Sequence, residues 1–193
     1  MAARTTPTGA SAARERLLRT ATELFYREGI HAVGVDRIIA EAGVTRATFY
    51  RHFPSKEDLV EAYLGVEDAN IRGAFDAAEA SGAEPRQLVG LVIEGLADDV
   101  ARNHTRGCPF INAAAEYPDP ESGVRRTVGE HREWFRSELE TVLGAAEVEA
   151  PEEAAAQLVL LRDAAMVGGY LDGWERVRPA FIAAATRTVG LDR

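Results

Sequence analysis

Apolar residues recur at intervals of three and four positions along most of the chain, which is the spacing of one face of an α-helix. No segment alternates apolar and polar residues over a useful length, and no internal repeat is visible, so strands are not expected. Glycine and proline interrupt the helical spacing and mark the ends of the predicted elements. The pattern predicts an all-α fold with about nine helices, over residues 11–28, 35–42, 46–53, 57–75, 86–101, 110–117, 121–145, 152–174 and 178–190.

Two of the predicted helices are short and are separated by a glycine turn. The segment "VDRIIAEAG" places its apolar residues on one face and stops at Gly43. Thr45 then has the side chain of a helix N-cap, and Phe49 and Phe53 are the apolar anchors of the next helix. Two short helices around such a turn predict a helix-turn-helix over about residues 34–53.

The charge of the chain is unevenly distributed. A net charge of -9 is the wrong overall sign for a protein that binds a polyanion. However, residues 1–56 hold 9 Arg and Lys against 5 Asp and Glu, whereas residues 57–193 hold 13 against 26. This asymmetry is typical of a protein in which a small basic part meets nucleic acid and the remainder has another task.

Composition narrows the class of protein further. With 193 residues, 46% of them apolar, the chain is long enough to bury a core. A single cysteine, Cys108, excludes an internal disulfide. No window approaches the roughly 18 to 20 continuous apolar residues of a membrane span, and the first residues have no apolar stretch of a secretory signal. We therefore expect a cytoplasmic protein that does not bind a membrane.

The N-terminal third resembles the tetracycline-repressor (TetR) family of bacterial transcriptional regulators. The resemblance rests on "ELFYREGI" followed by "VDRIIAEAGVTRATFYRHFPSKEDLV", and it covers about residues 12–60. It implies a dimeric regulator, with a helix-turn-helix DNA-binding domain and a helical domain for dimerisation and ligand binding. We assign residues 1–10 to a flexible arm, 11–72 to the DNA-binding domain and 73–193 to the second domain. Gly34 departs from the family pattern, which usually has Thr or Ser there.

In a helix-turn-helix, the first residues of the second helix meet base edges in the major groove. We expect Thr45 to Thr48 to read bases and the side chains from Tyr50 to Lys56 to contact phosphates. Any one arginine here is equally compatible with a solvated helix face, but the apolar spacing, turn glycine and basic cluster agree in favouring DNA binding. The predicted DNA-contacting residues are Gly34, Arg37, Thr45, Arg46, Ala47, Thr48, Tyr50, Arg51, His52 and Lys56.

The resemblance also implies partners for the acidic remainder. A homodimer through the last two long helices would present two recognition helices to a palindromic double-stranded DNA operator. Two faces rich in small or apolar residues are candidates for this interface, although they are equally suited to internal packing. They comprise Ala154, Ala155, Leu158, Leu161, Ala165 and Gly169 on one helix, and Phe181, Ala184 and Ala185 on the other.

A small, largely apolar effector is expected to bind in the second domain and to release the DNA, which makes the protein a ligand-controlled repressor. For each pocket candidate, ordinary core packing is the alternative. An alternative regulator would sense oxidants or electrophiles through Cys108. No enzyme motif, metal-ligand spacing or cofactor fingerprint is present, so we expect no catalytic activity, metal or cofactor. The candidate pocket residues are His104, Cys108, Phe110, Asn112, Glu116, Trp134, Met166, Tyr170 and Trp174.

Overall fold

The computed structural model describes the backbone of residues 9–191 and the side chains in that range, except those of residues 9–11, 102 and 103. Within the described range the chain forms nine helices and no strand, which confirms the predicted all-α class. Residues 1–8 of the predicted arm lie outside the described range, and residues 9 and 10 begin the first helix. The helices are α1 (Gly9–Glu28), α2 (Val35–Ala42), α3 (Arg46–His52), α4 (Lys56–Glu79), α5 (Pro85–Asn103), α6 (Pro109–Glu116), α7 (Gly123–Ala145), α8 (Pro151–Asp172) and α9 (Trp174–Thr188).

The last helix begins earlier than the sequence predicts. Gly173 has a φ of 89°, a backbone conformation that favours glycine, and it ends α8 and caps α9 at once. Because only this residue separates the two helices, α9 starts at Trp174 and Pro179 lies inside the helix, not in its first turn. Proline removes one backbone donor there, but its fixed φ is compatible with the helix.

The chain divides into two compact units, and their boundaries differ from the prediction. Unit 1 comprises residues 1–66 and 113–127, and unit 2 comprises residues 67–112 and 128–193. The single boundary predicted at residue 72 missed the return of 113–127 to the first unit. Helices α4, α6 and α7 therefore each contribute residues to both units.

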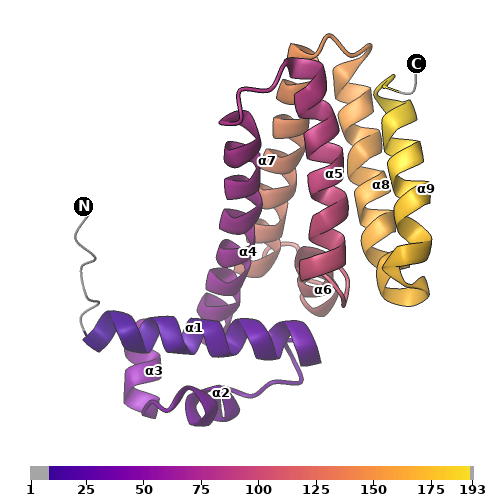
Figure 1. The fold of residues 1–193 in the computed structure, drawn as a ribbon. Coiled ribbons are helices and arrows are strands. Elements are labelled where there is room, and N and C mark those ends of the chain that lie inside the picture. Colours follow the sequence, from indigo (N-terminus) through magenta and orange to yellow (C-terminus); the bar gives the residue numbers. More distant parts are fainter. Residues whose placement is uncertain (1–8, 192–193) are drawn as a thin grey trace. The chain divides into compact units, whose positions relative to one another are not determined.

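Unit 1 is built around an apolar core. Helices α1, α2 and α3 contact one another in all three pairings. Figure 1 shows α1 as the long element of this unit, with the two short helices beside it. The side chains that fill the core are all at most 2% exposed, and they include Leu17, Leu24, Phe25, Ile38, Phe49, Phe53, Leu59 and Tyr63. The periodicity of the sequence placed these residues inward.

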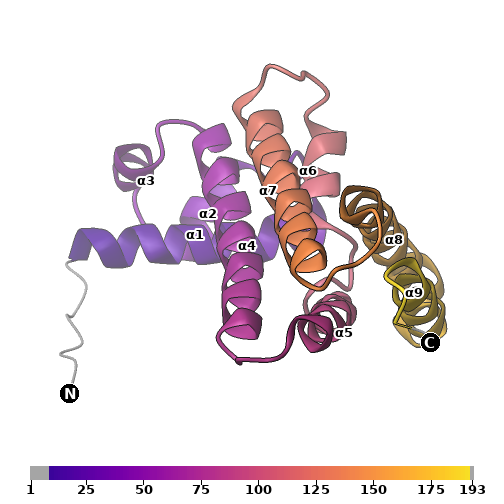
Figure 2. The same cartoon turned by 90° about the horizontal axis from the view of Figure 1, so that it is seen from above.

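Unit 2 contains a set of long helices that run side by side. Within this unit α5 contacts α8 and α9, and α8 contacts α9 over most of their length (Figures 1 and 2). Its core includes three polar or charged side chains, His104, His131 and Arg162, each 3% exposed. An apolar groove of about 260 Å³ lies between α4 and α5, with Ile71, Phe75 and Leu96 among its lining residues. No helix in the described range is both long and apolar enough to cross a membrane.

Candidate nucleic-acid interface

The turn between α2 and α3 is fixed by backbone geometry and one side chain. Gly43 ends α2 with a φ of 63°, and the Val44 N–H donates to the Ile39 carbonyl at 3.2 Å. Thr45 then caps α3, because its Oγ1 accepts a hydrogen bond from the Thr48 N–H at 3.2 Å. The two threonine hydroxyls are also 2.9 Å apart. These contacts set the direction in which α3 leaves the turn.

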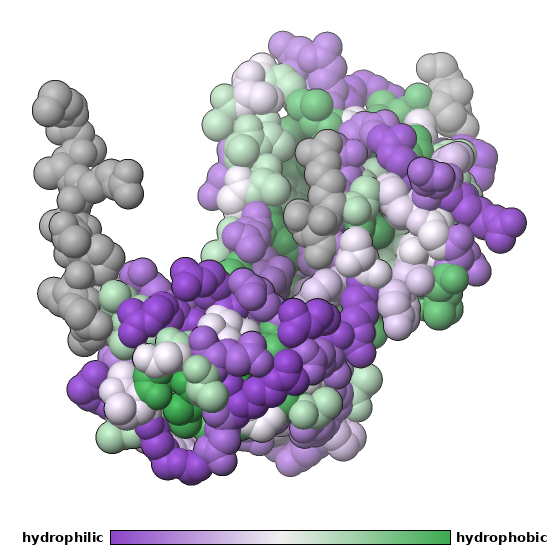
Figure 3. All heavy atoms as spheres, turned by 60° about the horizontal axis from the view of Figure 1, so that its bottom comes forward, coloured by the Kyte–Doolittle hydropathy of each residue, from purple (hydrophilic) through white to green (hydrophobic). Residues whose placement is uncertain are grey.

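Helix α3 has one buried face and one exposed face. Phe49 and Phe53 are 0% and 2% exposed and anchor the helix in the core of unit 1. Arg46, Tyr50 and Arg51 are exposed on the other side, Tyr50 with 45% of its surface accessible. Figure 3 shows that hydrophilic residues predominate on the side of unit 1 that carries α2 and α3. The predicted reading end and two of the predicted phosphate contacts thus share an exposed helix surface.

Arg46 forms an ion pair with Asp36 of α2. Both side chains are more than half exposed, at 61% and 77%, so the pair is weak and open to exchange. Arg46 is therefore free to leave Asp36 when a stronger anionic or base partner approaches. Ala47 is exposed beside it and leaves its methyl group accessible.

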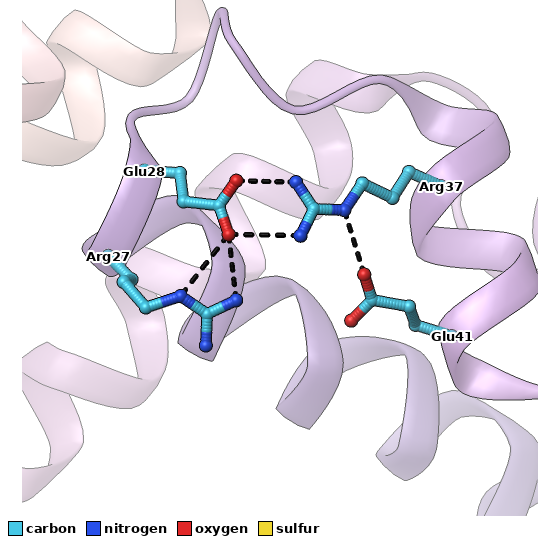
Figure 4. Close-up of polar contacts among 4 residues, drawn as sticks. All are labelled: Arg27, Glu28, Arg37 and Glu41. Atoms are coloured by element: carbon cyan, nitrogen blue, oxygen red, sulfur yellow. Dashed lines mark hydrogen bonds and ion pairs between the residues drawn. The ribbon is translucent and has the colours of Figure 1, made fainter.

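Arg37 is held by two carboxylates (Figure 4). Its Nη1 and Nη2 donate to both oxygens of Glu28 at the end of α1, and its Nε donates to Glu41 at 2.7 Å. Hydrogen bonds from Arg37 and Arg27 lower the pKa of Glu28 to about 2, and the hydrogen bonds of Arg37 to Glu28 and Glu41 raise the pKa of Arg37. All three nitrogens of the guanidinium are engaged, so Arg37 acts as a brace between α1 and α2. Because these ion pairs are exposed and can exchange, the predicted contact of Arg37 with DNA stays a prediction.

Lys56 also has an internal partner. Its Nζ donates to the Ile30 carbonyl at 2.6 Å and lies 5.8 Å from the centre of the Phe25 ring. Burial lowers the pKa of Lys56. The side chain is turned toward the loop after α1, which differs from the phosphate contact that the sequence suggested.

The loop after α1 has a second anchor, Glu116 at the end of α6. Its carboxylate accepts hydrogen bonds from the Ile30 N–H at 2.8 Å and the His31 N–H at 2.6 Å. Glu116 therefore belongs to unit 1 and supports the helix-turn-helix. Its carboxylate is committed to backbone donors of unit 1, so this position gives the predicted role in the ligand pocket no support.

The remaining predicted DNA contacts lie at the start of α2 and along α3. Gly34 is the N-cap of α2 and makes no side-chain capping bond, as expected for a residue without a hydroxyl. His52 is partly buried at the end of α3, and its Nε2 has no hydrogen-bond partner in the described part of the chain. Thr48 is half-buried. Thr45, Arg46, Ala47, Tyr50 and Arg51 are thus the predicted residues most open to a bound duplex.

The predicted pocket residues of unit 2 differ in exposure and in their contacts. His104, Cys108, Phe110 and Met166 are buried, whereas Tyr170 is 53% exposed on α8. The remaining three also have contacts of their own: Asn112 donates to the Arg106 carbonyl, Trp134 stacks under Arg72, and Trp174 packs on Phe181. None of the predicted residues lines the groove between α4 and α5. Cys108 is 2% exposed, so its position gives the oxidant-sensing alternative no support.

Three residues with notable contacts or burial in the structure were not predicted from the sequence. Glu28 was not recognised, although the spacing of four between Arg37 and Glu41 is itself a signal for a helix ion pair. Arg162 stands in the apolar run "LVLLRDAAM", where a charged residue is conspicuous. His131 offered no comparable signal, because its burial depends on the packing of α7 against Phe110.

A helix-turn-helix with an exposed basic recognition face, followed by a larger helical unit, defines the class of DNA-binding transcriptional regulators. The comparisons agree with this class. Residues 17–63 match the family model described as "Bacterial regulatory proteins, tetR family". The crystal structure of a TetR-family transcriptional regulator from Streptomyces coelicolor is 44% identical, with a TM-score of 0.88, and the match covers 93% of this chain and 95% of that chain. The chain belongs to the TetR family.

Two curated relatives give more partial matches. The transcriptional activator FasR of Mycolicibacterium smegmatis is 34% identical over 85 residues, which are 44% of this chain and 39% of FasR. The transcriptional repressor KstR2 of Rhodococcus jostii is 29% identical over 133 residues, which are 69% of this chain and 60% of KstR2. The chain thus spans less than two thirds of the length of these relatives. Both are transcriptional regulators, and neither the family nor the fold indicates an enzyme.

Proposed function

We propose that the protein is a transcriptional repressor that binds a palindromic operator as a homodimer and releases it when a small molecule binds to unit 2. The observation that carries the DNA-binding part is the exposed face of α3, which begins at the Thr45 cap and presents Arg46, Ala47, Tyr50 and Arg51. The N-terminal end of such a helix is the part that meets base edges. Because the target is chromosomal, we place this activity in the bacterial cytoplasm.

Within this face we assign different roles to the two ends. Arg46 is suited to a bidentate contact with guanine, and the Ala47 methyl is suited to contact with thymine. Tyr50 and Arg51 lie one turn further along and are suited to phosphates, which position the protein without reading sequence. Arg46 exchanges Asp36 for the base, which costs little because the pair is exposed.

Dimer formation is supported by an exposed apolar surface on α8. Leu160, Val167 and Leu171 are 68%, 46% and 70% exposed, which is unusual for large apolar side chains. Ala154, Leu158 and the other central members of the face predicted from small residues are buried, which favours the internal-packing alternative for them. We propose that the opposite face of α8, together with α9, meets the partner. Replacing Leu160 and Leu171 by Glu is expected to give monomers in light scattering and to weaken operator binding.

Ligand control is supported by the continuity of α6. This helix begins at Pro109, directly after buried Cys108 of unit 2, and ends at Glu116, which holds the loop after α1. A change around the start of α6 would therefore reach the backbone that supports the helix-turn-helix. One relative is named as a repressor and another as an activator. We favour repression, because a single ligand-induced change of conformation is enough to release the protein from its operator.

The proposal is tested by an electrophoretic shift with DNA from upstream of the protein's own gene. We expect a shift at low salt that weakens steeply as salt rises, because phosphate contacts release counterions. The Arg46→Ala variant should bind more weakly. Absence of a shift at low salt, with folded dimeric protein, would contradict the proposed function.

A further inference from the structure

A charged side chain lies in the interior of unit 2. Arg162 is near the middle of α8 and only 3% exposed. An ionised group in such a place costs free energy unless partners satisfy it. The contacts of the guanidinium therefore indicate whether other residues of the protein satisfy Arg162 or whether its charge is left for a ligand.

The guanidinium is only partly satisfied by the protein. Its Nη1 lies 3.7 Å from the Cys108 sulfur and 3.8 Å from Oδ1 of Asp163. Asp163 is already engaged, because its other oxygen accepts a hydrogen bond from Arg132 at 2.8 Å. The Nε and Nη2 of Arg162 have no hydrogen-bond partner among the residues that the structure describes.

The two unpaired nitrogens are not scattered around the group. Nε and Nη2 lie on the same edge of the planar guanidinium, and their N–H bonds point in nearly parallel directions. This edge is the one that binds the two oxygens of a carboxylate in the bidentate arrangement. The unsatisfied part of Arg162 thus has the shape of a carboxylate receptor.

The surroundings of this edge are aromatic. The guanidinium lies 5.0 Å from the centre of the Phe135 ring, and the His131 ring lies 6.1 Å from the same ring. His131 in turn stacks on Phe110, with centroids 3.7 Å apart and planes inclined by 1°. Its Nδ1 is bonded to Asp68, while its Nε2 also lacks a partner in the described range. Aromatic rings therefore lie close to two polar groups with unsatisfied hydrogen-bonding atoms, the guanidinium of Arg162 and the imidazole of His131.

We propose that Arg162 anchors a binding site for a small aromatic carboxylate, whose two oxygens bind the Nε and Nη2 edge while its ring packs among the side chains around Phe135. The proposal rests on the proposed function, because it names the chemical class of the effector. A metal cation is excluded as the occupant of this edge, because the guanidinium is positively charged and has no acceptor. Asp163 is not the occupant, since its nearer oxygen is beyond hydrogen-bond distance.

The groove between α4 and α5 lies next to this aromatic cluster. Phe75 lines the groove, and its ring packs edge-on against Phe135 at 5.9 Å. Asp99 also lines the groove and pairs with His104 at 2.9 Å. Movement of Phe75 would therefore open the aromatic cluster to a molecule in the groove.

The test is a thermal-shift titration of the full-length protein without DNA. Benzoate and phenylacetate are compared with the neutral benzamide and phenylacetamide, which keep the ring but not the charge. We expect the acids to stabilise the wild-type protein and the amides to have little effect. Arg162→Met should weaken binding of the acids by about 30-fold or more, because a buried charge pair is lost. Arg132→Met is the matched control: it removes a paired arginine of the same unit and should keep the response to the acids.

Stability without ligand gives an independent readout. Because the edge of Arg162 is unsatisfied, Arg162→Met should be at least as stable as the wild type, whereas Arg132→Met should be less stable. Arg162→Lys retains the charge but lacks the two-pronged edge, and it should bind the acids about tenfold more weakly. A marked loss of stability in Arg162→Met would show that the guanidinium has internal partners and would overturn the proposal.

Two further outcomes separate this proposal from the proposed function. If the acids bind no better than the amides, or bind equally well to Arg162→Met, the carboxylate site is refuted, even if other compounds release the operator. If the acids bind through Arg162 but do not release operator DNA, the site stands and its assignment as the effector site of a repressor fails. Binding is therefore measured first, and DNA release afterwards on the same protein.

Discussion

The two units of the molecule differ in where their charged and polar side chains lie. Those of unit 1 are on its surface, whereas unit 2 also has some in its interior. Unit 1 buries apolar side chains, and its ion pairs, such as those of Arg37 and Arg46, are exposed. The buried polar and charged side chains of the described chain, His104, His131 and Arg162, all lie in unit 2.

This difference indicates two ways of building a binding surface. A duplex is large and binds to an exterior, so unit 1 needs a rigid core beneath an exposed helix. A small ligand is bound by enclosure, and the proposed ligand-binding role of unit 2 would account for the cost of burying polar groups in its interior. Each of the following predictions tests one side of this comparison, from the largest expected effect to the smallest.

The largest effect is expected from the core of unit 1. Phe49→Ala removes a fully buried ring from α3 and should cost about 3 to 5 kcal/mol of the free energy of unfolding. Tyr50→Ala, at the next position but on the exposed side, should cost much less. Urea unfolding followed by circular dichroism compares the two. A similar cost for both would show that the inner and outer faces of α3 are not distinct.

A second effect is expected from the interior of unit 2 and depends on pH. Burial alone would lower the pKa of His104, but hydrogen bonds to Asp99 and Glu67 outweigh it and raise the pKa to about 9 from an ordinary value of 6.5. Because the folded pKa is the higher one, the stabilisation is complete below pH 6.5 and is lost as the pH rises to about 9. The stability difference between wild type and His104→Gln, at most a few kcal/mol, should shrink over that range.

His131 provides the matched control for this prediction. Burial lowers its pKa in spite of the hydrogen bond to Asp68, so its contribution has the opposite sign. The stability difference between wild type and His131→Gln should grow as the pH rises through the ordinary range of a histidine. Parallel pH profiles for the two variants would contradict the assigned environments.

A third effect is expected on DNA recognition. Arg46→Ala should lose about 1 to 3 kcal/mol of discrimination at one base position, because in the proposed function its bidentate contact reads that base. Arg51→Ala should weaken binding to all sequences alike and reduce the salt dependence. Fluorescence anisotropy with a set of single-base operator variants measures both. Equal changes in base preference would remove the distinction between reading and positioning residues.

The smallest effect is expected from the exposed ion pairs of unit 1. Hydrogen bonds from Arg37 and Arg27 lower the pKa of Glu28 from 4.5 to about 2, so its contribution is complete above pH 4.5 and is lost as the pH falls toward 2. Glu28→Gln should lower the melting temperature slightly at pH 7, and the difference should vanish near pH 2. Glu23→Gln, which removes an exposed carboxylate of the same helix, is the matched control.

Most of the fold was predictable because it depends on local patterns. Helical spacing located all nine helices of the described chain, and Gly43 and Thr45 marked the turn of the helix-turn-helix. The start of α9 was not predicted, because the conformation of Gly173 lets two helices follow each other without a loop. The return of residues 113–127 to unit 1 was not predicted either, since it depends on contacts between distant segments.

The site was predictable only where exposure follows from position on a helix. The outer face of α3 followed from the inward positions of Phe49 and Phe53. The pairing of Arg37 with Glu28 joins two helices, and sequence spacing does not report such contacts. The unsatisfied edge of Arg162 could not be predicted from the sequence either. Only the three-dimensional structure shows that no described residue accepts a hydrogen bond from its Nε and Nη2.

The hold of Glu116 on the loop after α1 has a consequence for engineering. The simplest chimaeric regulator exchanges one N-terminal segment. Here an exchange at residue 66 would separate Ile30 and His31 from the carboxylate that accepts their N–H groups. A transplantable DNA-reading head of this protein consists of two pieces of sequence, residues 1–66 and 113–127, and a functional hybrid must inherit both from the same parent.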